Sequence, residues 1–93
     1  MIFTIPLLPK AQQHIETAFE WYETISAELG LKFIEAVDAA MASLEEKPHN
    51  FFNETRIYRR IVIAGLPYKI IYEIENNKVF IVAVKHFSQD IDY

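Results

Sequence analysis

The three histidines are the first residues of this 93-residue chain that could carry acid–base or metal chemistry. His14, His49 and His86 fall in different predicted elements and lack the short spacing of zinc ligands, and the chain has no cysteine. We therefore predict no metal site and no cofactor. A catalytic histidine also needs a neighbouring group that orients its ring. His86 ends a predicted strand without such a group, so we interpret it as a hydrogen-bonded structural residue.

Cations and tyrosines of the second half of the chain are the next candidates. Around Arg59 and Arg60 the apolar residues recur with a period of two, so the two arginines point to opposite faces of a strand. Arg60 shares its face with Tyr58, and we predict that Arg60 rather than Arg59 lines a groove. Tyr68 and Tyr72 share one face of the following strand. They are interpreted as half-buried sheet residues, with a role in partner binding as the alternative.

Trp21, the only tryptophan, lies one position away from the apolar stripe of the first predicted helix. A tryptophan at this place either packs at the margin of the stripe or anchors an exposed interface. The sequence alone leaves both interpretations open.

Length and composition limit the classes of protein that the chain can belong to. It is short enough for one domain over residues 1–93, and 52% of its residues are hydrophobic. No apolar run reaches the roughly 18–20 residues that span a membrane, and the first residues carry no basic segment of a secretory signal. We expect a soluble cytoplasmic protein without a membrane partner.

Charge is divided unevenly between the two parts of the chain. The net charge is −4, which is unusual for a general nucleic-acid binder. Residues 1–55 hold nine acidic and three basic residues, whereas residues 56–93 hold four acidic and six basic ones. A solvated acidic helix surface explains this division, and a basic half that meets an acidic partner or RNA is the alternative.

The elements that must position these residues follow from the hydrophobic periods. We predict a short edge strand at residues 2–5, a helix from Pro9 to Ala27, an interruption at Gly30, a second helix ending near Lys47, and a loop at 48–55. The inward residues are Ile15, Ala18, Phe19, Tyr22 and Ile25 in the first helix, Phe33, Val37, Ala40, Met41 and Leu44 in the second, and Ile57, Ile61 and Ile63 in the strand after the loop.

Two more strands complete the predicted order. They contain Tyr68–Ile74 and Val79–Lys85 and are joined by a turn at Asn76–Asn77. The last strand is apolar on both faces, which indicates a central place in the sheet. The order β-α-α-β-β-β predicts an α+β fold with a helical hairpin packed on a mostly antiparallel sheet.

Three sequence patterns in this order resemble the RelE/ParE toxin superfamily, and its ParE branch in particular. Phe33, Val37, Leu44 and Pro48 match the pattern that ends the helix pair in ParE-like toxins. Arg60 followed by Leu66-Pro67-Tyr68-Lys69-Ile70-Ile71-Tyr72 looks like the family's Phe-Pro-Tyr-Arg-x-x-Tyr stretch, and Ile81-Val82-Ala83-Val84-Lys85-His86 like its Ile-x-Ala-Val-x-His ending. The tail departs from the family, because Gln89 and Ile91 stand where an arginine and a proline are common.

The resemblance implies two different activities. A ParE-like toxin acts on DNA gyrase through protein contacts, whereas a RelE-like toxin is a ribosome-dependent endoribonuclease that cuts mRNA. In the RelE case Arg60, Lys69 and Tyr93 would be the catalytic residues, while Val62 and Gln89 replace further cations of the family. A family member that has lost toxicity is the third alternative.

A protein antitoxin is the partner that the resemblance implies in every case. The helical hairpin and a sheet edge would form a groove for its helix and strand. The residues predicted to bind a partner are Trp21, Tyr58, Arg60, Tyr68, Tyr72 and His86. An edge strand left free is also compatible with a homodimer.

Overall fold

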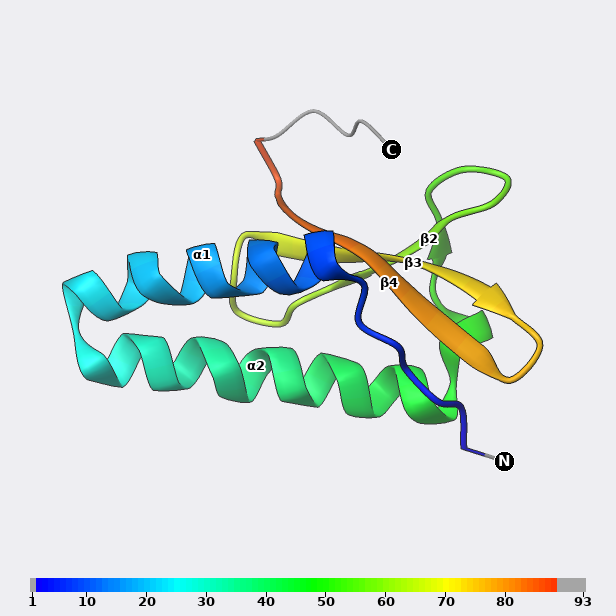
Figure 1. Cartoon of the computed structure of the whole chain (residues 1–93), viewed down its shortest axis with the longest axis horizontal. Coiled ribbons are helices and arrows are strands. Elements are labelled where there is room, and N and C mark those ends of the chain that lie inside the picture. Colours follow the sequence, from blue (N-terminus) through cyan, green and yellow to red (C-terminus); the bar gives the residue numbers. More distant parts are fainter. Residues whose placement is uncertain (1, 89–93) are drawn as a thin grey trace.

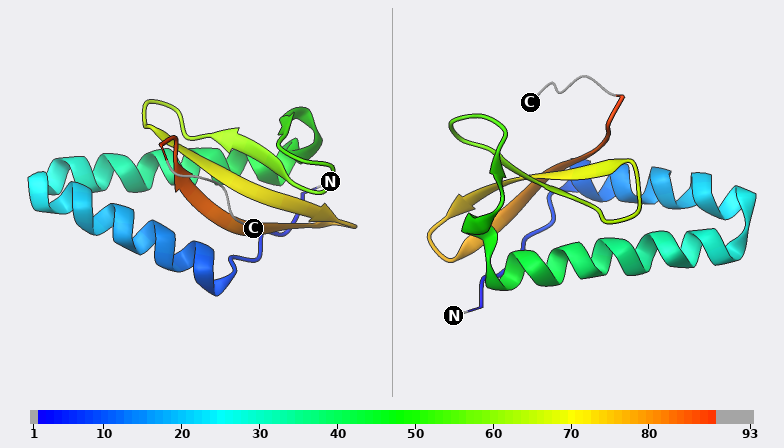
Figure 2. Two further views of the ribbon diagram at one scale, coloured as in Figure 1. Left: turned by 90° about the horizontal axis from the view of Figure 1, so that it is seen from above. Right: turned by 180° about the vertical axis from the view of Figure 1, so that it is seen from behind.

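The computed structural model describes residues 2–88, in which a pair of helices lies along one face of a sheet (Figures 1 and 2). The elements are α1 (Pro9–Ile25), α2 (Ala27–Glu46), the 3-10 helix η1 (Pro48–Asn50), β1 (Phe52–Asn53), β2 (Arg59–Val62), β3 (Tyr68–Glu75) and β4 (Lys78–His86). The four strands are antiparallel in the order β1-β2-β3-β4. This arrangement confirms the predicted α+β class with a helical hairpin on the sheet.

The N-terminal segment runs beside β4 but does not form a regular strand. It makes two isolated parallel bridges, from Thr4 to Lys78 and from Leu7 to Ile81. Pro6 separates the bridges, and proline has no N–H to continue the ladder. The predicted first strand is thus present as an extended edge segment. Over its first half, β4 lies between this segment and β3, as expected for a central strand.

The break between the helices falls at Ser26, so the predicted interruption at Gly30 was wrong. Ser26 is extended, and its side-chain Oγ accepts a hydrogen bond from the backbone N–H of Leu29 at 3.1 Å. That contact caps α2. Gly30 lies buried inside α2, where a Cβ atom would stand 3.2 Å from Cε1 of Phe19. Glycine therefore suits the close approach of the two helices, because a larger residue would push the Phe19 ring away by a few tenths of an ångström. The sequence pattern could not distinguish this role from a helix end.

The core lies between the hairpin and the sheet. The stripe predicted for α2 is confirmed, with Phe33, Val37, Ala40 and Leu44 buried and Met41 partly buried against this core. These residues pack with Ile61, Ile63, Ile70, Tyr72, Val79 and Ile81 of the sheet. In α1 the outcome differs at one position, because Ile25 is exposed near the end of the helix and Ala11 is buried instead.

The predicted loop 48–55 contains the short strand β1, and the following strand starts later than expected. Oγ1 of Thr55 accepts hydrogen bonds from the N–H groups of Ile57 and Tyr58 at 3.1 and 2.9 Å. This turn delays β2 until Arg59 and leaves Ile57 exposed, so its predicted inward position was wrong. The predicted turn at Asn76–Asn77 is confirmed, with Asn76 at a φ of 56°. None of the helices between residues 2 and 88 is long and apolar enough to cross a membrane.

Candidate functional site

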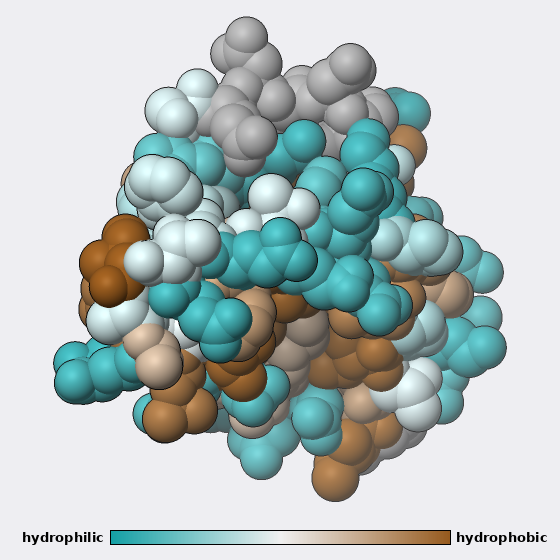
Figure 3. Space-filling model, turned by 60° about the vertical axis from the view of Figure 1, so that its left-hand side comes forward, coloured by the Kyte–Doolittle hydropathy of each residue, from teal (hydrophilic) through white to brown (hydrophobic). Residues whose placement is uncertain are grey.

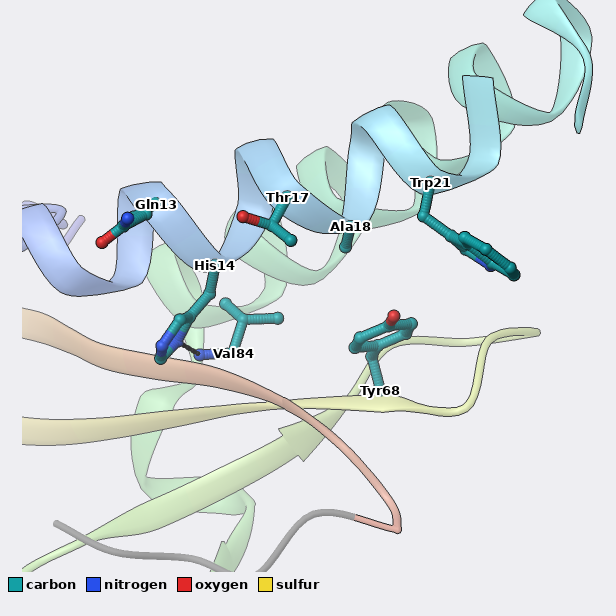
Figure 4. Close-up of a pocket in the computed structure, with 7 residues that line it drawn as sticks. All are labelled: Gln13, His14, Thr17, Ala18, Trp21, Tyr68 and Val84. Atoms are coloured by element: carbon teal, nitrogen blue, oxygen red, sulfur yellow. Dashed lines mark hydrogen bonds between the residues drawn. The ribbon is translucent and has the colours of Figure 1, made fainter. Parts of the chain in front are cut away.

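A hollow of about 430 Å³ opens between α1 and the sheet (Figure 4). It is lined by Gln13, His14, Thr17, Ala18, Trp21, Tyr68 and Val84. The α1 residues of this set recur at spacings of three and four, which places them on one side of the helix. None of the seven lining residues is a carboxylate, and two of them are large aromatic rings.

Trp21 and Tyr68 form the aromatic end of this hollow, where their rings flank the same opening (Figure 4). Trp21 is 62% exposed, so it does not pack at the margin of the core. Tyr68 is half-buried, and its ring meets those of Tyr22, Phe33 and His86 at centroid distances of 6.3, 6.0 and 5.2 Å. The structure therefore brings three predicted partner-binding residues together, with Tyr68 held in place between its neighbours.

His14 lies at the other end of the hollow and contacts the backbone of β4. Its Nδ1 accepts a hydrogen bond from the backbone N–H of Val84 at 3.1 Å (Figure 4). Burial, and then the positive charges of Lys85 and Lys10, lower the pKa of His14. Each of these effects disfavours the imidazolium form, and the neutral ring is the form that can accept this bond. Sequence reasoning missed this role, although the spacing of four to Ala18 was a usable signal.

His86 has local partners at the end of β4. Its Nδ1 accepts a hydrogen bond from the backbone N–H of Ser88 at 3.0 Å and lies 2.8 Å from the Oγ of the same residue. The ring also meets Tyr68 edge-on. The interpretation of His86 as a hydrogen-bonded structural group is in keeping with these contacts.

Arg60 and Lys69 come together on the face of the sheet that points away from the helices. The Oε1 atom of Glu54 lies 3.4 Å from Nη1 of Arg60 and 3.2 Å from Nζ of Lys69. The guanidinium of Arg60 also lies over the ring of Phe52 at 4.4 Å. One carboxylate is thus shared by two cations, which leaves this group with a charge of about +1. Glu54 was missed because it lies outside any periodic segment.

A smaller hollow of about 300 Å³ adjoins this ion cluster and is lined by Arg60, Val62, Lys69 and Phe87. It is on the opposite face of the sheet from Tyr68, since neighbouring strand residues alternate in direction. The candidate residues therefore form two separate surfaces. We call the first, lined by Trp21 and Tyr68, the helix-side hollow. The second, formed by Glu54, Arg60, Lys69 and the adjoining hollow, is called the outer-face cluster.

The remaining predicted site residues have other surroundings. Tyr72 is fully buried, and its hydroxyl donates a hydrogen bond to the carbonyl of Pro48 at 2.6 Å. Burial raises the pKa of Tyr72 to about 12, although the positive charge of Arg59 lowers this pKa by a smaller amount. Tyr58 is half-buried, and its backbone closes the turn before β2. Tyr93 lies outside the described residues. Residues 2–88 hold no cluster of three histidine or acidic side chains that could bind a metal.

Comparison with known proteins agrees with this architecture. The chain is similar to a protein of the chromosomal ParDE toxin–antitoxin system from P. aeruginosa, with a TM-score of 0.79, 12% identity, and coverage of 91% of this chain and 96% of that chain. At this identity the likeness establishes the fold. No curated protein matches the sequence significantly.

The family itself is identified from the sequence. The model of the family described as the ParE toxin of the type II toxin–antitoxin system parDE matches residues 5–91, which is nearly the whole chain. The match includes both helices and all four strands. The chain therefore belongs to the ParE toxin family of type II toxin–antitoxin systems.

Proposed function

We propose that this protein is the toxin of a type II toxin–antitoxin pair, that a protein antitoxin neutralises it in the cytoplasm, and that it acts on DNA gyrase through protein contacts. The observation that carries the proposal is the match of the ParE toxin family over residues 5–91. The fold shared with a ParDE system protein is in keeping with it. A toxin of this kind needs surfaces for two proteins and no active site.

For the antitoxin we propose the helix-side hollow as the docking site. Exposed Trp21 and half-buried Tyr68 supply aromatic area to the hollow, and such residues are enriched among the anchors of protein interfaces. Lys10 and Lys85 lie close enough to His14 to affect its pKa, so this end of the hollow is positive. The complementary partner segment is amphipathic and carries apolar residues beside acidic ones.

Trp21 provides a direct test, because it is the only tryptophan of the chain. Adding the product of the adjacent small open reading frame, in a form without tryptophan, should shift the Trp21 emission to shorter wavelength as the ring leaves water. Trp21→Ala should weaken the complex by about tenfold or more, the usual effect of an interface anchor, in a calorimetric titration. Arg60→Gln, on the outer face, is the matched control and should bind with unchanged affinity. An unshifted Trp21 spectrum in a stable complex would place the antitoxin elsewhere.

For the target, purified protein should inhibit supercoiling by gyrase. The proposal predicts that Lys69→Ala inhibits supercoiling as well as the unchanged chain, because Lys69 is 9% exposed and paired with Glu54. Failure of the soluble, folded protein to inhibit gyrase would remove gyrase from the proposal.

Ribosome-dependent mRNA cleavage is the second candidate, and one observation favours it. This activity would use three residues, and two of them, Arg60 and Lys69, contact the same carboxylate of Glu54. That carboxylate also weakens the candidate, since Glu54 offsets charge that would otherwise neutralise a phosphate. Cleavage of mRNA on ribosomes that is lost in Lys69→Ala would establish this activity, with Tyr93→Phe testing the third residue. Growth unaffected by expression would instead favour a non-toxic family member.

A homodimer stays a prediction that rests on the sheet edge. β1 pairs with β2 only at Arg59 and Arg60, so Ile61 and Val62 have no strand partner on that side among the described residues. An open edge of this kind can take up a strand from a second chain. Light scattering during size-exclusion chromatography would give the mass of the particle directly.

A further inference from the structure

A third cavity, of about 350 Å³, is formed by residues at one end of the sheet. This end, with η1 and the β3–β4 turn, is remote from the connection between α1 and α2 (Figure 1). The lining of the cavity comes from η1, β1, the following turn, β2, β3 and the β3–β4 turn: His49, Asn53, Arg56, Ile57, Arg59, Ile74 and Asn76. It shares no residue with the helix-side hollow or the outer-face cluster. We call it the arginine cup.

Arg59 is fixed in the wall of the cup by backbone contacts. Its Nη1 atom donates to the carbonyl of His49 at 3.1 Å and to the carbonyl of Phe51 at 2.9 Å. A guanidinium carries five N–H donors, so these two bonds orient the group and leave donors for another ligand. The bonds also tie η1 to β2 and give the wall a fixed shape.

The positive charge of the cup is not balanced by an ion pair within the described part of the chain. Arg60 next along β2 is paired with Glu54, but among residues 2–88 neither Arg56 nor Arg59 takes part in an ion pair. The carboxylates nearest in the sequence are directed elsewhere. Glu54 is held by Arg60 and Lys69, and Glu75 points to the other face of β3 from Ile74, which lines the cup.

The other lining groups suit an anion as well. His49, Asn53 and Asn76 can each donate hydrogen bonds, and no lining residue is acidic. Arg56 and Arg59 line the same cavity, and arginine is a residue that proteins use for phosphate, because the guanidinium fork matches two phosphate oxygens. Ile57 and Ile74 form an apolar side of the cup, and its volume falls in the range of small-molecule sites.

We propose that the arginine cup binds a phosphate group, either as free phosphate or as the phosphate of a nucleotide whose sugar and base lie against Ile57 and Ile74. This site does not depend on the toxin function. The site depends only on the end of the sheet where η1, β2 and the β3–β4 turn meet.

The test is a titration of the isotope-labelled full chain with inorganic phosphate, AMP and citrate, followed by amide chemical shifts in low salt. The expected result is saturable shift changes at Asn53, Arg56, Arg59 and Asn76 with phosphate and AMP. Tighter binding of AMP assigns the nucleotide as the source of the phosphate, and equal affinities assign free phosphate. An equal response to citrate would contradict the phosphate class.

Two variants and one control decide whether the cup is the site. Arg56→Gln removes an exposed cation, and Asn76→Asp adds a carboxylate at a residue whose φ of 56° both side chains tolerate. Arg56→Gln should weaken phosphate binding about tenfold, the effect of losing one charge-assisted hydrogen bond. Asn76→Asp should weaken it about as much, because the added carboxylate repels the phosphate. Lys32→Gln changes the net charge equally on exposed α2 and should leave the affinity unchanged.

Several outcomes would overturn the proposal. They are the absence of saturable shifts with both phosphate and AMP, shift changes that cluster at Arg60 and Lys69, and unchanged affinity in Asn76→Asp. Arg59 is left intact in these experiments because its bonds to η1 make its replacement a test of folding as well as of binding.

Discussion

At the scale of single residues, the side chains of this protein divide into those that hold the fold and those that are offered to partners. Tyr72 and Tyr68 illustrate the division, since they lie four residues apart on the same face of β3. Tyr72 is fully buried, with its hydroxyl on the Pro48 carbonyl, whereas Tyr68 reaches the helix-side hollow. Period two could place both rings on the helix side, but it could not tell which ring stays accessible.

Replacing Tyr72 by phenylalanine should destabilise the fold without affecting the partner surface. The change leaves the buried carbonyl of Pro48 without its donor, which costs about 1–2 kcal/mol. Urea unfolding measures this loss. Tyr68→Phe keeps the ring contacts and is the control, for which we expect little change in stability. Equal losses in the two variants would mean that the Tyr72 hydroxyl contributes nothing specific.

His14 should make the stability depend on pH. Because burial and the lysines Lys85 and Lys10 lower its pKa from 6.5 in the folded state, the unfolded chain takes up a proton at a higher pH than the folded chain. The stabilisation is therefore complete above the unfolded pKa of 6.5 and is lost progressively as the pH falls below it. Protonation also removes the acceptor of the Val84 N–H bond.

Urea unfolding at about pH 7.5 and about pH 5 tests this dependence on either side of the ordinary histidine pKa. His14→Gln does not titrate, and its amide oxygen can still accept the bond from Val84, so it should lose less stability on acidification than the unchanged chain. His49→Gln replaces an exposed histidine remote from the hollow. This variant should lose as much stability on acidification as the unchanged chain. If His14→Gln loses as much stability at low pH as the unchanged chain, His14 is not the cause of the pH dependence.

At the scale of elements, the hairpin depends on two small residues with different tasks. Ser26 ends α1 and caps α2, while Gly30 permits the helices to approach. The sequence could predict two helices from their periods of three and four, but both residues are plausible helix breakers. Contact between α1 and α2 decides between them, and such long-range contact is not encoded in local periodicity.

Ser26→Ala should therefore lower the free energy of unfolding by about 1 kcal/mol, because the N–H of Leu29 loses its acceptor. Ser43→Ala is the matched control. Ser43 lies within α2 and donates back to the carbonyl of Ala39 at 3.3 Å, so its replacement should be neutral or slightly stabilising. A Ser26 variant as stable as the control would show that the cap is dispensable.

The order of the sheet was predicted from the sequence, but the edge formed by β1 and the start of β2 was not. The strands containing Arg60, Tyr68 and Val79 follow from alternation, whereas β1 and the delayed start of β2 depend on side-chain bonds from Thr55 and Arg59. Site residues follow the same rule. Arg60 and Lys69 come close because of the strand register, in which Arg60 is opposite Ile71 and Lys69 is opposite Val62. Glu54 and His14, in contrast, lie on segments whose positions only the tertiary structure determines.

At the scale of the whole molecule, charge and apolar surface separate the faces that partners could use. The part of the chain that forms the helices and β1 is acidic, and the part that forms β2 to β4 is basic. Apolar residues interrupt the hydrophilic surface on the side where the hairpin tip comes forward (Figure 3). The exposed apolar side chains of the chain include Trp21, Ile25, Leu31, Phe52 and Phe87. These side chains lie on both helices, on β1 and just after β4, so the exposed apolar surface is not confined to one face of the molecule.

Growth after induced expression, with and without the adjacent small open reading frame, shows whether this protein is a toxin that an antitoxin neutralises. We expect that this chain alone arrests growth and that the adjacent reading frame restores it, since an antitoxin covering the helix-side hollow would neutralise the toxin. Trp21→Ala should remain toxic but escape rescue if its only role is to anchor the antitoxin. Unimpaired growth of cells that contain the soluble, folded protein would contradict the claim that it is an active toxin.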